Sequence, residues 1–141
     1  MTSLPLLKGI GFETAASGHP YFLWWLTEDP ALHKHVKQSI KDSGNQVYIS
    51  AATVWEISIK ETLGKLTLPE DMEGDMEKVV EEERFLELPI SLYHAQIAGG
   101  LPMIHKDPFD RMLIAQAQAQ RLLLVTDDVQ IKKYPVQVFS N

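Results

Sequence analysis

Short apolar segments alternate in this chain with stretches of helical periodicity, and this alternation limits the folds open to it. Residues 47–50 (VYIS) and 136–139 (VQVF) are strand-like, and residues 122–126 (LLLVT) form the continuous apolar run of a buried parallel strand. In the long stretch between the first and the last of these, apolar residues recur at helical spacing. Strands that alternate with helices build a parallel sheet covered by helices, so the sequence predicts one α/β domain.

Residues suited to capping a helix precede three of the expected helices. Ser50 and Ser91 carry the side-chain oxygen that a helix start prefers, and Asp107 is followed by Pro108, which favours the first helical position. A strand is also expected at residues 85–90. The expected helices span residues 30–43, 51–64, 92–100 and 107–121.

The formal net charge of −6 at first argues against a nucleic-acid partner. One segment, residues 69–88, carries this charge, because it holds nine Asp and Glu residues against Lys78 and Arg84. Within it, Met72, Met76 and the valines that follow recur at helical spacing. We therefore expect a helix with a solvated acidic face there. The rest of the chain has no negative net charge that would exclude RNA as a partner.

Several classes of function are excluded by what the sequence lacks. It has no cysteine, and therefore neither disulfide bonds, thiolate zinc sites nor a cysteine nucleophile. Glycine-rich phosphate loops and the GxSxG motif of serine hydrolases are also missing. The longest apolar run, residues 21–26, is far shorter than the roughly 20 residues of a membrane helix. We expect a cytoplasmic protein with no membrane segment.

Three carboxylates from distant parts of the chain form the candidate site. Glu56 follows the strand 47–50, Asp110 lies at the start of a helix, and Asp128 follows the strand 122–126. Ligands of open parallel sheets bind outside the carboxyl ends of the strands, so these side chains are expected to converge. Clustered carboxylates repel each other unless a cation neutralises them, and Mg²⁺ or Mn²⁺ prefers oxygen ligands. Such a site suits the hydrolysis of phosphate esters.

Each of these acids also has a purely structural interpretation. Glu56 could pair with Lys60 one helical turn away. Asp107 and Asp110 could be helix caps, and Asp128 could close a turn. The residues by themselves leave both interpretations open.

At these residues the sequence resembles the PIN-domain family and, within it, the VapC-type ribonuclease toxins of bacterial toxin–antitoxin pairs. The resemblance extends from about Phe22 to Phe139. It rests on FLWWLTEDPAL, VYISAATVWEISIKETLGKLTLP, ELPISLYHA, HKDPFDRMLIAQA and LLLVTDD, which occur in family order with family-like spacing. It implies a three-layer α/β/α domain with a central parallel sheet over residues 21–141, preceded by an atypical segment, residues 1–20.

The resemblance also implies a site, an activity and partners. Glu56, Asp110 and Asp128 would be the catalytic acids and the ligands of Mg²⁺ or Mn²⁺. The implied activity is Mg²⁺-dependent endonucleolytic hydrolysis of RNA, and the implied partners are RNA, a VapB-like antitoxin and a second copy of the chain in a homodimer. Four further residues would lie around the acids or contact the RNA backbone: Asp107, Lys60, His105 and Arg111.

The amino-terminal segment departs from the family pattern. The family's first strand, roughly LLLDTH, ends in an Asp, and Gly18 stands at the matching position here. The first strand is therefore expected to be atypical or disrupted, with residues 10–13 as its best candidate, and residues 1–20 could be disordered or come from a shifted reading frame. Glu13 could replace the missing acid if five extra residues before Trp24 are looped out.

Two functions from different classes stay open at this stage. The first is a VapC-like endoribonuclease, weakened or inactive because its first acid is absent. The second is a catalytically inactive PIN-like module that still dimerises and binds an antitoxin. A third possibility is the remnant of a degraded gene that no longer folds. An active toxin should arrest growth on expression, whereas an inactive module should be harmless.

Overall fold

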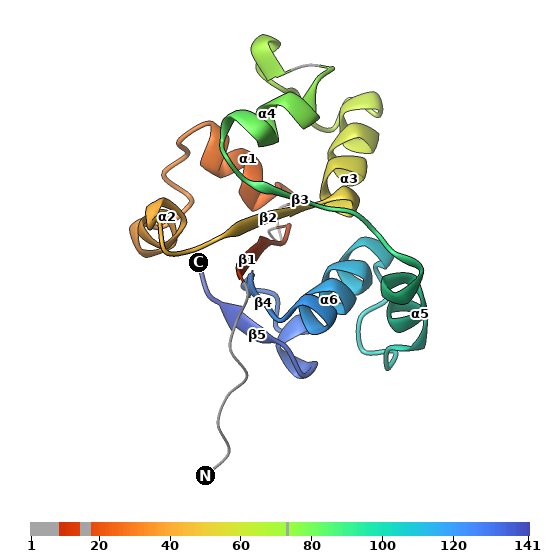
Figure 1. The fold of residues 1–141 in the computed structure, drawn as a ribbon. Coiled ribbons are helices and arrows are strands. Elements are labelled where there is room, and N and C mark those ends of the chain that lie inside the picture. Colours follow the sequence, from red (N-terminus) through yellow and green to blue (C-terminus); the bar gives the residue numbers. More distant parts are fainter. Residues whose placement is uncertain (1–8, 15–17, 73) are drawn as a thin grey trace.

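A five-stranded, all-parallel sheet organises the protein (Figure 1), in a computed structural model that describes residues 9–14, 18–72 and 74–141. The strand order is β3-β2-β1-β4-β5, so β1 lies at the centre. The strands are β1 (Gly9–Phe12), β2 (Val47–Ser50), β3 (Leu86–Leu88), β4 (Leu122–Val125) and β5 (Gln137–Phe139). The helices are α1 (Tyr21–Leu26), α2 (Lys34–Lys41), α3 (Ala51–Thr62), α4 (Met76–Glu82), α5 (Leu92–Gly100) and α6 (Pro108–Gln120), with short 3₁₀ turns at Glu70–Met72 and Ile131–Lys133.

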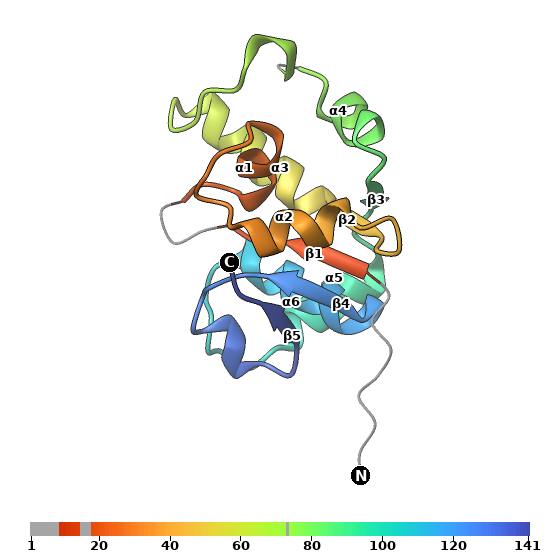
Figure 2. The same cartoon turned by 90° about the vertical axis from the view of Figure 1, so that its left-hand side faces the viewer.

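Helices cover both faces of the sheet, because alternate strand residues point to opposite faces. Ile10 and Phe12 of β1 belong to the core cluster that includes residues of α1, α2 and α4. Tyr48 of β2 and Leu124 of β4 belong to the cluster beneath α6. Figure 1 and Figure 2 show α1 and α2 on one side of the sheet and α5 and α6 on the other. The predicted three-layer α/β/α architecture with a central parallel sheet is confirmed.

Local capping signals located three helices correctly. Ser50 Oγ accepts a hydrogen bond from the Ala52 amide at the start of α3, and Ser91 Oγ accepts one from His94 at the start of α5. Asp107 caps α6. The acidic segment contains a 3₁₀ turn followed by α4, as its helical spacing indicates.

Two helical elements differ from expectation. The helix expected from Pro30 begins only at Lys34, because Asp29 caps a tight turn instead: its Oδ1 accepts from the Ala31 amide. The apolar run of residues 21–26 forms α1, a helix that was not among those expected from the sequence. This helix buries Tyr21 and Phe22 on the sheet, and such burial stabilises a six-residue helix that would be marginal alone.

The first strand is present at the centre of the sheet. β1 pairs in parallel with β2 on one side and β4 on the other, with Ile10 opposite both Val47 and Leu123. The predicted candidate, residues 10–13, differs from β1 by one residue at each end. Part of the segment expected to precede the domain therefore belongs to the same sheet as the strands that follow residue 21.

Two further expectations concern the amino-terminal segment: its disorder and a shifted reading frame. Of the atypical segment 1–20, residues 1–8 and 15–17 lie outside the described part, so the expectation of disorder there stays a prediction. The hypothesis of a shifted reading frame stays a prediction about the nucleotide sequence. Across the described ranges, no helix combines the length and the apolar character needed to cross a membrane.

Candidate metal centre

The candidate site lies where the three central strands end. Because β2, β1 and β4 are adjacent and parallel, their carboxyl ends lie at the same edge of the sheet. Glu13 directly follows β1, and Asp128 follows β4. Glu56 lies in the second turn of α3, directly after β2, and Asp110 lies in the first turn of α6. Acidic side chains from four elements thus approach one edge.

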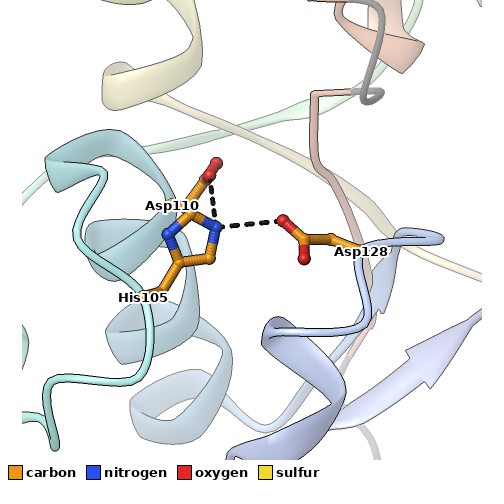
Figure 3. Close-up of side chains that lie close together, drawn as sticks. All are labelled: His105, Asp110 and Asp128. Carbon is orange, nitrogen blue, oxygen red and sulfur yellow. Dashed lines mark hydrogen bonds and ion pairs between the residues drawn. The ribbon is translucent and has the colours of Figure 1, made fainter.

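His105 joins two of these acids. Its Nε2 lies 2.8 Å from Oδ2 of Asp110 and 2.9 Å from Oδ2 of Asp128 (Figure 3). The three side chains each offer a ligand atom, and these atoms all lie within 4.8 Å of one another. Asp110 and Asp128 are therefore close enough to share a cation, as predicted. No local pattern pairs His105 with Asp128, because Asp128 follows a strand end 23 residues away.

Glu56 lies beside this cluster and has its own contacts. Its Oε1 accepts a hydrogen bond of 2.6 Å from the hydroxyl of Thr14, and its Oε2 lies 3.8 Å from Nζ of Lys60. Only 7% of Glu56 is exposed, and its negative charge acts on both Glu13 and Asp110. Glu56 thus pairs with Lys60, as its structural interpretation has it, and its charge also reaches two other acids; its role as a metal ligand stays a prediction. Glu56 does not share the three-residue cluster of Figure 3.

Glu13 is the most buried acid of the site, with 1% of its surface exposed. One oxygen, Oε1, accepts from the Thr14 amide. The other, Oε2, finds no hydrogen-bond donor among the described residues. A buried carboxylate without a partner is costly, so this oxygen requires a proton or a cation.

Burial raises the pKa of Glu13 well above its usual range, and the facing carboxylate of Asp110 raises it further. Burial also raises the pKa of Asp110 to about 6, whereas the neighbouring Glu13 carboxyl group and the charge of His105 act in the opposite direction. Burial and the proximity of the other acids thus disfavour the charged form of both carboxyl groups. Such mutual repulsion between acids is typical of a site that binds a cation.

Residues 20 and 21 return to the point where β1 ends; that Glu13 replaces the family's first acid stays a prediction. The Tyr21 amide donates to the Glu13 carbonyl, and Thr14 pairs with Pro20, so the chain leaves and rejoins the same point. Gly18, at the position where the family has its Asp, accepts a 2.6 Å hydrogen bond from Lys60. Gly18 has a φ of +88°, a conformation that favours glycine over an acidic residue.

Two of the predicted accessory residues hold the backbone in place. Asp107 caps α6, since its Oδ1 accepts from the Phe109 and Asp110 amides, and its charge also raises the pKa of Asp110. Arg111 corrects an expectation: its guanidinium is buried and donates to backbone carbonyls rather than to the acids or to a solvent-facing ligand. The carbonyls within 3.1 Å of it belong to Ala98, Leu101, Pro102 and His105.

Two positioning contacts were missed from the sequence. The Tyr134 hydroxyl accepts from the His105 amide at 2.7 Å and donates to the Pro102 carbonyl at 2.6 Å, which fixes the loop that carries His105. Thr14 contacts both Glu13 and Glu56. Tyr134 has no local sequence signal, whereas Thr14 could have been found from its place after the acid that ends β1.

The residues at this edge fit a divalent metal ion. Carboxylate oxygens predominate, the unpartnered Glu13 oxygen is buried, and Asp110 and Asp128 lie within range of a common ligand. Hard cations such as Mg²⁺ and Mn²⁺ prefer this donor set. A divalent charge would also relieve the repulsion that raises the two pKa values.

Comparison with known proteins identifies a family and solved structures of similar fold. A family model described as "PIN domain" matches residues 21–137 of the chain. This match begins after β1, so it leaves Glu13 outside. No curated protein sequence matches the chain.

Among solved structures, the chain is similar to one described as VapBC2 from Rickettsia felis bound to a DNA fragment from their promoter. The TM-score is 0.62 at 15% sequence identity, over 86% of this chain and 92% of that one. At this identity the similarity establishes a common fold.

Proposed function

Because the chain belongs to the PIN domain family, we propose that it is a VapC-like toxin that hydrolyses RNA with the help of a divalent metal ion. The observation that carries this proposal is the approach of four acids to one edge of the sheet: Asp110 and Asp128 share a cluster with His105, Glu13 faces Asp110, and Glu56 acts on both Glu13 and Asp110. The metal would be Mg²⁺ or Mn²⁺, and the cell compartment the cytoplasm.

In this proposal Glu13 takes the place of the acid that the family has at the end of its first strand. Its side chain is one methylene longer than that of Asp, and the chain returns to its backbone at Tyr21. Its position beside Asp110 supports a site with the four acids of the family pattern, Glu13, Glu56, Asp110 and Asp128. The expectation of weak or absent activity rested on a missing first acid, so Glu13 favours the active enzyme over the inactive module.

The roles of the residues follow from their contacts. Glu13, Asp110 and Asp128 would hold the metal, with Glu56 close by; when bound, the metal polarises a phosphoryl oxygen and lowers the pKa of a water molecule. His105 would compensate the acids while the metal is absent. Lys60, held beside Glu56 and partly exposed, would face the RNA backbone.

Two protein partners belong to the proposal. The similar Rickettsia felis structure is a VapBC complex, which supports a VapB-like antitoxin as a partner of this chain. A homodimer is supported by large apolar side chains left at the surface. Trp55 on α3 and Leu63 directly after α3 are 62% and 61% exposed, and Leu92 and Tyr93 on α5 are 91% and 65% exposed. Contact with a second copy would remove this apolar surface from water.

The test is cleavage of RNA by the purified chain. Total cellular RNA and labelled synthetic RNAs would be incubated with Mg²⁺ or with EDTA, using the wild type, Asp110→Asn and Glu13→Gln. We expect metal-dependent cleavage by the wild type and a loss of at least about 100-fold in each variant, because each removes a metal ligand.

Glu81→Gln is the matched control, since Glu81 is an exposed acid on α4 and should tolerate the change. Cleavage that persists in Asp110→Asn would come from another site or a contaminant and would overturn the proposal. No cleavage by the wild type, together with antitoxin binding, would establish the inactive module instead.

A further inference from the structure

Thr14 contacts two acids of the site at once. Its backbone amide donates to Oε1 of Glu13, and its hydroxyl donates to Oε1 of Glu56 over 2.6 Å. These two acids come from different elements, one from the end of β1 and one from α3, and they lie 43 positions apart in the sequence. Thr14 is the residue that joins them.

The two hydrogen bonds engage one oxygen of each carboxylate and leave the other. For Glu13 the remaining oxygen is Oε2, which is buried and has no donor among the described residues. For Glu56 the remaining oxygen is Oε2. It forms an ion pair with Nζ of Lys60 at 3.8 Å, a distance longer than a hydrogen bond. The oxygens left over by Thr14 are therefore those that a cation would use.

Thr14 is itself held in place from both sides. It forms an isolated antiparallel bridge with Pro20, and the following Tyr21 amide donates to the Glu13 carbonyl. Thr14 is half-buried and Glu56 is buried, so water competes little with the Thr14 hydroxyl for the Glu56 carboxylate. A hydroxyl fixed in this way can orient a carboxylate without losing much conformational freedom on binding.

We propose that Thr14 is a positioning residue for the metal centre: its amide and hydroxyl orient Glu13 and Glu56 so that one oxygen of each faces the divalent ion. This inference rests on the proposed function, because it assumes that the acids bind a metal. Thr14 is assigned no contact of its own with the ion or the RNA. It acts through the two acids.

Mn²⁺ binding to the purified, metal-free protein tests the proposal without relying on RNA cleavage. Thr14→Val removes the hydroxyl and keeps the shape of the side chain, whereas Thr14→Ser keeps the hydroxyl. Measured by titration calorimetry and by the electron paramagnetic resonance signal of free Mn²⁺, Kd should rise about 10-fold or more in Thr14→Val. In Thr14→Ser it should stay within about twofold of the wild type, by the same reasoning. Thr62→Val, at the exposed end of α3, is the control.

A double-mutant cycle with Glu56→Gln identifies the path of the effect. If Thr14 acts through Glu56, Thr14→Val should weaken Mn²⁺ binding much less in the Glu56→Gln background than in the wild type. In RNA cleavage, Thr14→Val should lower kcat and leave KM nearly unchanged, since the substrate is not contacted. Equal effects in both backgrounds would overturn the proposed path.

The outcomes separate this inference from the proposed function. If the wild type binds Mn²⁺ and Thr14→Val binds it equally well, Thr14 is no positioning residue although the metal site stands. If the wild type binds no Mn²⁺, the metal site itself fails. If Thr14→Val does not fold, Thr14→Ala against Thr14→Ser makes the same comparison, and equal Kd values in that pair would also overturn the inference.

Discussion

Nε2 of His105 lies 2.8 Å from Oδ2 of Asp110, and the same nitrogen also faces Asp128 at 2.9 Å. One nitrogen thus serves two carboxylates at the edge of the sheet (Figure 3). A protonated imidazole in this position would compensate their negative charge. His105, two positions before the Asp107 cap of α6, is therefore part of the site.

His105→Ala should destabilise the metal-free protein by about 1 to 2 kcal/mol near neutral pH, because a charge-assisted hydrogen bond to a partly buried acid is lost. Urea unfolding measures this change. His33→Ala, at an exposed histidine, should leave the free energy of unfolding nearly unchanged. Unaltered stability in His105→Ala would show that the imidazole does not compensate the acids.

The stability of the metal-free protein should depend on pH through Asp110. Its pKa in the folded protein, about 6, lies above the ordinary value of 3.8. Between these values the folded protein keeps a proton that the unfolded chain has released, so stability from this group falls as pH rises through 6. Relative to the wild type, Asp110→Asn should gain roughly 2 kcal/mol between pH 4 and pH 7.

Urea unfolding of both proteins at several pH values checks this prediction. The difference between the two proteins is the measured quantity: acids far from the site affect both alike, and the substitution also removes the carboxylate that raises the pKa of Glu13, which acts in the same direction. A difference that stays constant from pH 4 to pH 7, or that favours the wild type at pH 7, would contradict the raised pKa of Asp110.

Mn²⁺ should stabilise the wild type against heat. At 100 times its Kd, a ligand adds about 2.7 kcal/mol, which corresponds to a rise in Tm of roughly 6 to 10 °C for a domain of this size. Glu13→Gln should keep nearly the same Tm without metal, because Gln resembles the protonated acid. It should lose most of the rise on metal addition.

Differential scanning calorimetry with and without Mn²⁺ measures both effects. Glu81→Gln should behave like the wild type in both conditions. A Glu13→Gln protein with a full metal response would show that Glu13 is not a ligand.

Arg111 should matter for stability more than for chemistry. Its guanidinium donates to several carbonyls between Ala98 and His105 and thereby ties the loop after α5 to α6. Arg111→Met should cost about 3 kcal/mol in unfolding free energy, because buried carbonyls lose charge-assisted donors. Chemical denaturation tests this, and a cost below 1 kcal/mol would contradict the proposed bracing role.

Two glycines of β1 should differ in their tolerance of alanine. A Cβ at Gly9 would lie 2.6 Å from the Gln46 carbonyl oxygen and 2.7 Å from the Tyr48 ring, whereas at Gly11 the nearest atoms are at 3.7 Å. Gly9→Ala should destabilise the protein by about 1 to 3 kcal/mol through overpacking. Gly11→Ala should cost much less, and the reverse order in thermal unfolding would contradict the placement of β1.

Local sequence signals were enough for much of the fold. Strand β2 and the starts of α3, α5 and α6 were identified from capping residues and apolar runs, because these signals act between neighbours in the chain. The parallel sheet followed from the alternation of strands and helices. Glu56, Asp110 and Asp128 were identified as site candidates because strand ends in such a sheet lie at one edge.

Tertiary structure alone decided the rest of the site. That Glu13 ends the central strand depends on where residues 9–12 pair between β2 and β4, and no local pattern encodes that pairing. The partners of His105 and Arg111 were likewise set by packing: Asp128 comes from another strand end, and the carbonyls around Arg111 come from the preceding loop. Local propensities fix helix starts and strands, whereas the burial and partners of a charged side chain depend on segments that only the folded chain brings together.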